Sequence, residues 1–401
     1  MLHRLPNKMD ARKLNNQNMI SILFKILFLF INLSTGVLLA RSLSLSERGL
    51  GGLIFSLISI LSIWQSVQHN EKLFRDKHLQ STLEINALEQ LIYLGLIFAV
   101  CIFEEIESLF PIILTLFIIS VLNSRLLAIT YLRRGLILDR LLQLFHLLVL
   151  LIVIILLNSL NLFNLRNWVT LVLFAEFLLV VLLFWLNVSD HFQFKLRFEQ
   201  KSFLNSFSLQ NFVLNSENLN DRYMIFMASI IFSSDDLALF VVAMSFVSIV
   251  GLPVTASYPH PVVNAKQVQL QLVNLTQKKK ALFIILGFVY LISCYLGIAN
   301  FTHLVLGEKY LEIENIALGI VLGGAGTGMM KYFSAVWRGL GNGSLGNVMQ
   351  LISLVITSLG IFSIKFILSS DISILNVFLI WALLNIFTSI LLIRRIWNFA
   401  F

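Results

Sequence analysis

The feature that most constrains this chain is a series of long apolar segments that recurs along nearly its whole length. We place them near residues 19–40, 50–66, 87–103, 109–124, 141–157, 168–187, 207–232, 237–258, 281–300, 316–335, 347–368 and 374–393. A bilayer core of about 30 Å is crossed by about 20 apolar residues in a helix. The segments therefore predict an all-α integral membrane protein with about twelve transmembrane helices.

The composition agrees with this interpretation. Of the 401 residues, 58% are hydrophobic and only 12% are charged, whereas soluble proteins carry about 25% charged residues. This balance excludes a soluble enzyme, a secreted disulfide scaffold and a nucleic-acid-binding module. Cys101 and Cys294 lie inside apolar segments, and neither they nor the histidines have the spacing of metal ligands. We therefore expect no metal and no cofactor.

The positions of lysine and arginine set the expected orientation. An even number of spans places both termini on one side; with that side inside the cell, 22 of the 29 basic residues fall in inside segments. Lys25 and Arg222 fall within spans, and five residues fall in outside loops: Arg41, Arg48, Arg166, Lys309 and Lys365. Because cytoplasmic loops are enriched in lysine and arginine, we expect both termini in the cytoplasm.

The longest inside loop divides the chain into two halves. We expect a cytoplasmic N-terminal segment at 1–18, a six-helix bundle at 19–190, a cytoplasmic linker at 191–206 and a second six-helix bundle at 207–401. Ser46-Glu47-Arg48 precedes an apolar run in the first half, as Ser234-Asp235-Asp236 does 188 residues later. Repeated halves of six helices are a known transporter plan, with the substrate site near the membrane midplane between them.

The seventh span carries the most informative polar pattern. One helical face holds Asn211, Asn215, Asn218 and Arg222, and the neighbouring face holds Glu217 and Asp221. Such a stripe is costly against lipid but acceptable against a wet cavity. Alternatively, it could form a buried polar network that only joins helices. We expect these side chains to line a substrate cavity.

Ionisable groups in two other spans are further candidates for the cavity. Lys25 shares a face of the first span with Asn32, and it either lines the cavity or extends to the cytoplasmic interface. Glu176 lies near the middle of the sixth span. It either pairs with a cation such as Arg222 or takes up a proton.

Proline and glycine mark two more features. Three of the five prolines lie in or just after the end of the eighth span, at Pro253, Pro259 and Pro261. Because proline removes a helical hydrogen bond, we expect that helix to bend or end there and to act as a gate. The glycine-rich run from Gly323 to Gly328 lacks the Lys-Ser/Thr of a phosphate loop, so we expect it to pack helices closely.

Several short motifs resemble those of one transporter family. Residues 38–43 with Glu47-Arg48-Gly49 resemble the first-loop pattern of bacterial oligosaccharide (O-antigen type) flippases, and Leu219-Asn220-Asp221-Arg222 resembles a run in their helix 7. Leu252-Pro253, Leu306-Gly307 and Arg338-Gly339-Leu340-Gly341 are similar to later motifs, in the same order. These flippases belong to the multidrug/oligosaccharidyl-lipid/polysaccharide (MOP) exporter superfamily. The similarity runs from about residue 20 to 395.

This resemblance implies a fold and a function. The fold is that of the MOP and MATE transporters, with two helical bundles around a central cavity. The function is translocation of a polyprenyl-(pyro)phosphate-linked oligosaccharide across the bacterial cytoplasmic (inner) membrane by alternating access, for O-antigen, capsule or exopolysaccharide synthesis. The implied partners are that lipid-linked oligosaccharide, membrane lipids, and the polysaccharide polymerase and glycosyltransferases of the same pathway, with no nucleic acid.

Two other functions stay open at this point. A MATE-type multidrug exporter would carry an amphipathic cation and favour acidic groups in its cavity, whereas a cavity of net positive charge would favour an anionic lipid. A polytopic glycosyltransferase or polysaccharide polymerase would need outside loops that hold a sugar against catalytic carboxylates. The acidic cluster Glu104-Glu105-Glu107 lies on a short loop, so we expect a transporter rather than an enzyme.

Overall fold

The computed structural model describes residues 11–75, 82–187, 193–197, 209–256, 277–340, 343–367 and 372–398. The first half of the chain forms α1 (Ala11–Ser42), α2 (Leu45–Arg75), α3 (Ala87–Phe103), α4 (Phe110–Arg134), α5 (Leu136–Ser159) and α6 (Leu165–Asn187). The second half forms α8 (Leu209–Ile231), α9 (Ser234–Val250), α10 (Leu252–Ala256), α13 (Gln277–Leu306), α14 (Glu312–Asn315), α15 (Ala317–Gly339), α16 (Gly343–Phe362) and α17 (Ile374–Asn398). Short turns η2 (Glu107–Leu109) and η3 (Glu308–Tyr310) precede α4 and α14, and a π-helical turn η4 (Ser363–Ile367) follows α16.

Many of these helices have the properties of membrane spans. In the part of the chain that the structure describes, seven helices are long and apolar enough to cross a membrane. The number is eight if Glu308–Asn315 and Ala317–Trp337, which meet at a bend of 64°, form one broken span. Few of the described apolar side chains of α5 and α13 are buried, as expected of helices that face lipid. The chain is a multi-pass membrane protein, while the crossing of the bilayer by all twelve expected segments stays a prediction.

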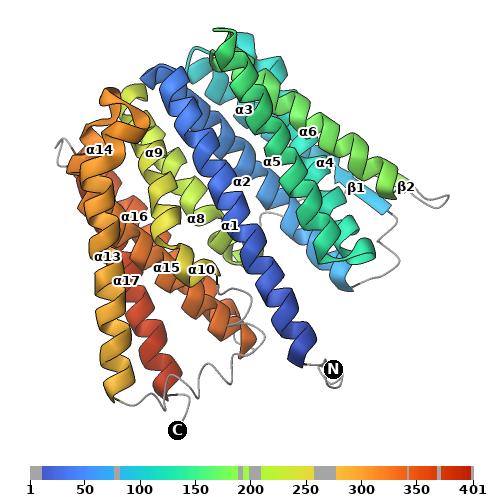
Figure 1. Ribbon diagram of the computed structural model, residues 1–401. Coiled ribbons are helices and arrows are strands. Elements are labelled where there is room, and N and C mark those ends of the chain that lie inside the picture. The colour runs from blue at the N-terminus through green and yellow to red at the C-terminus, as the bar shows by residue number, and fades with distance from the viewer. Residues whose placement is uncertain are drawn as a thin grey trace.

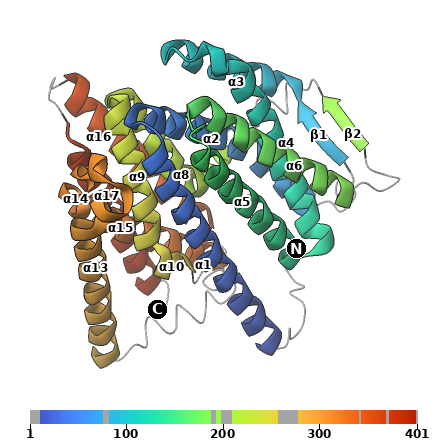
Figure 2. The same cartoon turned by 45° about the horizontal axis from the view of Figure 1, so that its top comes forward.

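The two halves of the chain form two groups of helices that converge at one end. Figure 1 shows α1 to α6 on one side and α8 to α17 on the other. The groups lie closest at the end where α13 meets α14, and they separate toward the end where α1 begins and α17 ends. Figure 2 shows the same two groups from a second direction. We call these the closed end and the open end.

Glycine permits the close contact between the two halves. The helix α2 packs against α8 and α9. A β-carbon added to Gly49 of α2 would lie 2.0 Å from the carbonyl oxygen of Ser234, at the start of α9. Within the second half, a β-carbon on Gly324 of α15 would lie 2.6 Å from the β-carbon of Val250. The glycine run of α15 therefore packs helices closely, as its sequence predicts.

One short parallel sheet accompanies the helices of this mostly helical fold. The strands β1 (Thr82–Asn86) and β2 (Gln193–Arg197) pair in register, with Thr82 opposite Gln193 and Asn86 opposite Arg197. Both segments alternate polar and apolar residues, which is the period of a strand. β2 lies within the expected cytoplasmic linker, so the linker pairs with the segment between α2 and α3.

Candidate functional site

A cavity of about 1040 Å³ lies between the two halves of the chain. Residues of α1, α2, α5, α6, α8 and α9 line it, together with the last residues of α13. A smaller hollow of about 380 Å³ adjoins it and extends toward α10 and α15. Four residues line both hollows: Leu29, Asn32, Asp221 and Ser248. The two hollows therefore form one continuous cleft.

An ion pair joins α8 and α15 at the smaller hollow. Nζ of Lys331 on α15 lies 2.7 Å from Oδ2 of Asp221 on α8. Both side chains are half-buried, and both line the smaller hollow. Lys331 thus neutralises Asp221. Arg222, which follows Asp221 in the chain, is exposed in the larger hollow and takes no part in that ion pair.

Arg48 also lines the larger hollow. It lies in the first turn of α2 and is only 7% exposed. Its guanidinium carbon lies 5.3 Å from the centre of the Trp168 ring, a cation–π contact that favours a desolvated arginine. Among the residues that the structure describes, no acceptor takes a hydrogen bond from its Nε. Arg48 is therefore a buried cation with unused donor capacity at the cavity wall.

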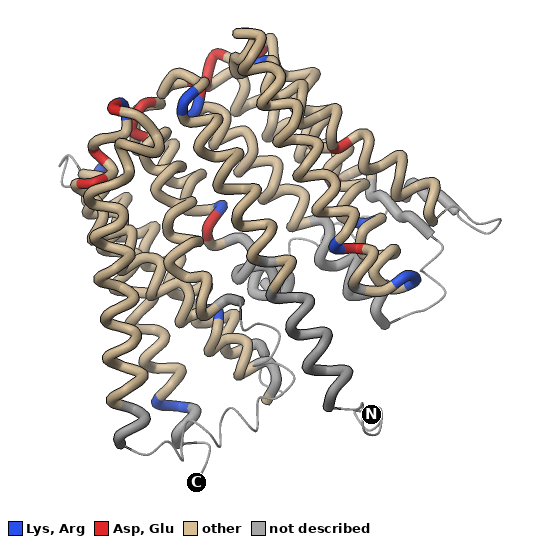
Figure 3. Tube along the Cα trace, in the orientation of Figure 1, with Lys and Arg blue, Asp and Glu red and all other residues tan. Residues whose placement is uncertain are grey.

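The described residues give the cavity a positive charge. Arg48, Arg222 and Lys331 contribute three positive charges, Asp221 contributes one negative charge, and the net charge is +2. Figure 3 shows that most described charged residues lie near the ends of the helices, with few in between. Charges within spans are costly, so the few that line the cleft are strong candidates for function.

The cleft brings together part of the predicted set. Asn32, Asp221 and Arg222 line it. Lys25 lies in α1, and α8 contains Asn211, Asn215, Glu217 and Asn218, but these five side chains lie outside the described residues. Pro253 is exposed in α10, after α9 ends at Val250, so the helix breaks near this proline as expected. Pro259 and Pro261 lie outside the described residues.

Glu176 requires a correction. It lines neither hollow, and among the described residues its partners come from its own half of the chain. The side-chain amide of Asn123 on α4 donates to its carboxylate, and His146 of α5 lies 3.5 Å away. Glu176 therefore does not line the cavity as predicted, and of its two alternatives the pairing with Arg222 is wrong, because Arg222 lines the cleft while Glu176 faces α4 and α5.

Arg48 is the cavity residue that sequence reasoning missed. The sequence places it in an outside loop because the second apolar segment begins at residue 50, but α2 already begins at Leu45. Ser44 and Glu47 form a capping box, in which the Glu47 carboxylate accepts from the Ser44 amide at 3.1 Å and Ser44 Oγ accepts from the Glu47 amide at 3.3 Å. This Ser-x-x-Glu signal could have placed Arg48 inside the helix.

Polar contacts join the two halves at the closed end. Arg41 of α1 donates to the carbonyl oxygens of Leu304 and Val305, at the end of α13, over 2.9 and 2.8 Å. Lys309 donates to the carbonyl oxygen of Leu43 over 2.5 Å. We call these contacts of Arg41 and Lys309 the outer clasp. They cross from one half of the chain to the other on one side of the cavity.

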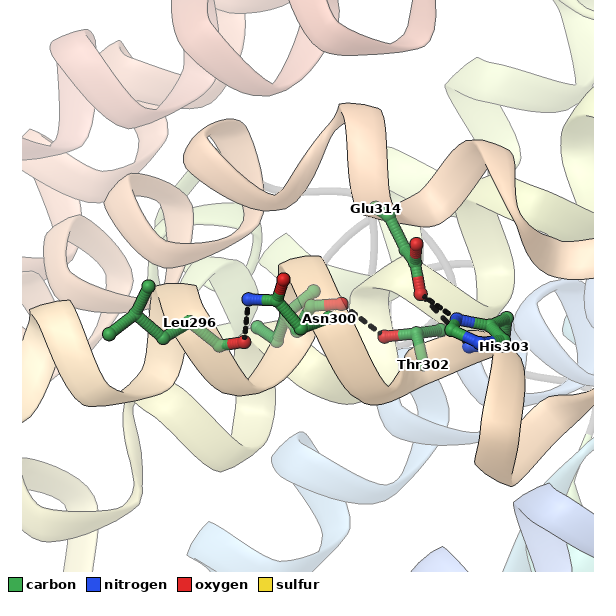
Figure 4. A network of polar contacts seen from close by, with 6 residues as sticks. Leu296, Asn300, Thr302, His303 and Glu314 are labelled. Atoms are coloured by element: carbon green, nitrogen blue, oxygen red, sulfur yellow. Dashed lines mark hydrogen bonds and ion pairs between the residues drawn. The ribbon is translucent and has the colours of Figure 1, made fainter.

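A second network supports the α13 side of the outer clasp. Figure 4 shows His303 and Glu314 pointing toward each other, from the end of α13 and from α14. Glu314 Oε1 lies 2.6 Å from His303 Nδ1 and accepts from the His303 amide at 3.1 Å. Asn300 and Thr302 bond to carbonyl groups of their own helix. The end of α13, which receives Arg41, is thus fixed against α14.

No family model matches the sequence, and neither does any curated protein. Solved structures do match. One is described as the inward-facing conformation of a multidrug resistance MATE family transporter of the MOP superfamily; the match has a TM-score of 0.63 at 15% identity and covers 92% of this chain and 94% of that chain. Another is the lipid II flippase MurJ in an inward closed conformation, with a TM-score of 0.58 at 14% identity, covering 93% of this chain and 87% of that chain. The chain therefore has the fold of MOP-superfamily transporters.

Proposed function

We propose that this protein is a flippase that carries a polyprenyl-(pyro)phosphate-linked oligosaccharide from the inner to the outer leaflet of the bacterial cytoplasmic membrane. The product would feed the synthesis of a cell-surface polysaccharide, together with glycosyltransferases and a polymerase. Both termini would be cytoplasmic. The protein would move its substrate by alternating access and would perform no chemistry on it.

The observation that carries this proposal is the positive charge of the cleft. A diphosphate that leaves water needs cationic partners, because an unpaired anion in a low-dielectric site is very costly. Arg48 on α2 and Arg222 on α8 supply such partners from the two halves of the chain. Guanidinium groups can bind phosphate oxygens in a bidentate way. The Asp221 carboxylate offsets only one of the three described positive charges, and it is paired with Lys331 at 2.7 Å.

Two further features support transport by alternating access. The cleft of about 1040 Å³ is large enough for a charged head group with sugars. The outer clasp closes the molecule on one side of this cleft through hydrogen bonds between the halves. Breaking these hydrogen bonds and loosening the packing of α2 on α8 and α9 would allow the halves to separate there while the open end closes. Lys25, the asparagines of α8 and the proline gate would serve the same cycle.

A second candidate is export of an amphipathic cation. It is favoured by the match to a MATE transporter and by the aromatic side chains of Phe30, Phe55 and Trp168 along the cleft. Such a substrate would have to overcome the repulsion of the two arginines. We therefore rank this function second.

The test of the flippase proposal is transport in proteoliposomes. The probe is a fluorescent polyprenyl-diphosphate disaccharide whose label is accessible to a membrane-impermeant quencher only in the outer leaflet. Arg222→Ala should abolish its movement while the protein stays folded, and Arg222→Lys should restore it partly, because lysine offers only a point charge. If Arg222 acts only as a neutralising partner of Asp221, the double variant lacking both charges should recover transport. That recovery would contradict substrate binding by Arg222.

A further inference from the structure

The larger hollow ends at the outer clasp. Val305, in the last turn of α13, lines the hollow, and its carbonyl oxygen accepts a hydrogen bond from Arg41 at 2.8 Å. Arg48 lines the same hollow. It follows Leu43, whose carbonyl oxygen accepts from Lys309, by five residues. The wall of the hollow and the contacts of the clasp are therefore continuous.

Arg48 lies between a side chain of each half of the chain. Its guanidinium carbon is 5.3 Å from the centre of the Trp168 ring on α6. Tyr310 of η3, from the second half, lies near Arg48 and is fully buried. Tyr310 follows the clasp residue Lys309, whose Nζ lies 5.6 Å from the centre of the Tyr310 ring. A displacement of Arg48 therefore changes the packing of η3, which carries Lys309.

Two polar atoms at this junction lack hydrogen-bond partners among the described residues. They are Nε of Arg48 and the hydroxyl oxygen of Tyr310, and both are buried. The neighbouring carboxylate is already engaged, because Glu47 accepts from the Ser44 hydroxyl at 2.9 Å and from the Leu165 amide at 3.1 Å. Buried polar groups without partners are costly. The described conformation thus carries a free-energy cost that an acceptor for Nε would remove.

Arg48 and Arg222 lie at different depths in the cleft. Gly49 approaches Ser234 at the start of α9, so the corner between α8 and α9 is level with the first turn of α2. Arg222 lies nine residues before α8 ends at Ile231. At 1.5 Å per residue, this is roughly 14 Å deeper along the helix. Arg222 therefore lies nearer the middle of the cleft, and Arg48 lies at its closed end.

The burial of Nε makes the affinity of Arg48 for an anion depend on conformation. A guanidinium binds a phosphate in a bidentate way through two of its N–H groups. In the described conformation Nε is buried, so a phosphate in the hollow cannot use it. Separation of Tyr310 from Arg48 would uncover this donor. A ligand shifts a conformational equilibrium by its differential affinity for the two states, so a phosphate on Arg48 favours the conformation in which the clasp is open.

We propose that Arg48 is the phosphate sensor of the outer clasp. A diphosphate that passes from Arg222 to Arg48 draws the guanidinium away from Tyr310, and the contacts of Lys309 and Arg41 then break. This inference rests on the proposed function, because it requires an anionic substrate. It adds an order of events, in which Arg222 is the first contact from the open end and Arg48 is the contact that opens the closed end.

The first experiment measures the closed end without transport. Spin labels at Arg166→Cys and Glu312→Cys, both exposed, lie in the first turn of α6 and in α14, one on each half. The probe is inorganic diphosphate, and sodium chloride at equal ionic strength is the control for screening. Diphosphate should lengthen the distance between the labels in the parent, and chloride should not. An equal response to chloride, or none to bound diphosphate, would overturn the proposal.

Two variants separate sensing from binding. In Arg222→Gln, saturating diphosphate should still lengthen the distance, at a midpoint concentration raised about 10- to 100-fold. In Arg48→Gln the distance should stay short at every concentration, although calorimetry should still detect bound diphosphate. A variant Arg48→Gln that responds like the parent would contradict the sensor. One whose halves are apart without diphosphate would also contradict it, because that result is expected if Arg48 only holds the closed end together.

The conservative variant Arg48→Lys guards against a loss of folding in Arg48→Gln. It keeps the positive charge but offers only a point charge in place of the planar fork. It should therefore bind diphosphate and lengthen the distance only partly. A full response in Arg48→Lys would contradict the role assigned to Nε.

Transport measurements separate this inference from the flippase proposal. The parent and Arg48→Gln are compared in proteoliposomes with the polyprenyl-diphosphate probe, which the parent should move and Arg48→Gln should not. A parent that opens its closed end with diphosphate but moves no probe contradicts the flippase function alone. A parent that moves the probe while Arg48→Gln moves it equally fast contradicts the sensor alone. A parent that binds no diphosphate contradicts both.

Discussion

Gly49 offers the sharpest test of how the two halves separate. In Gly49→Ala the new β-carbon would lie 2.0 Å from the backbone carbonyl oxygen of Ser234 and 3.2 Å from the backbone nitrogen of Ala238. Backbone atoms cannot rotate away as a flexible side chain can, so α2 and α9 must move apart. Overpacking of this kind costs about 1–3 kcal/mol. If only the described conformation holds α2 and α9 this close, its population relative to the alternative should fall by about 5- to 150-fold.

The assay for this prediction measures the distance between spin labels at Arg134→Cys and Arg394→Cys, which are exposed in the last turns of α4 and α17. Gly49→Ala should move the distance distribution away from that of the parent. The control is Gly95→Ala, because no heavy atom lies within 4 Å of its added β-carbon, and it should leave the distribution unchanged. The reasoning is refuted if both variants keep the parent distribution, or if both change it equally.

Three further predictions concern other contacts. Arg41→Ala removes two hydrogen bonds of the outer clasp, which contribute about 1 kcal/mol each. It should therefore raise the yield with which an externally added thiol reagent labels cysteines placed at the closed end. An unchanged labelling yield would contradict the role of the clasp. Exchanging the charges of Asp221 and Lys331 should preserve the free energy of unfolding. Lys331→Ala alone should lower it by about 1–3 kcal/mol, between the cost for an exposed pair and that for a fully buried pair, because both side chains are partly exposed. Equal stability of the two variants in thermal unfolding would show that the pair is unimportant. Impermeant thiol reagents should label a cysteine at Glu105 from outside and one at Lys279 only from inside, and labelling of both from one side would refute the proposed topology.

The helices could be predicted from the sequence because their signal is local. Each expected apolar segment overlaps a long helix of the structure, since apolar runs of this length have few other folds. Helix ends were harder to predict. The helix α2 begins at Leu45, where a capping box of polar residues starts it, and not where the apolar segment begins. The small sheet was missed because its two alternating segments lie over a hundred residues apart, and neither is a strand without the other.

The cavity was only partly predictable, because some of its contacts join residues that lie far apart in the sequence. The polar face of α8 pointed to Asp221 and Arg222, which lie in the cleft. The partner of Asp221 is Lys331, 110 residues later, and no spacing rule connects the two. Glu176 was expected in the cavity, with Arg222 as one alternative partner, because a helix period gives a residue's depth but not the helix that it faces. Here the packing of α4 and α5 on α6 decides its partners.

The most direct test of the central claim is the charge preference of the cleft. Purified protein is titrated with a fluorescent polyprenyl diphosphate and, separately, with tetraphenylphosphonium, a lipophilic cation. The account predicts saturable binding of the diphosphate, weakened by about 10- to 100-fold in Arg48→Gln and in Arg222→Gln, as expected for losing a hydrogen bond to a charged group, with no competition from the cation. Tighter binding of the cation, strengthened by either substitution, would contradict the account and favour a multidrug exporter.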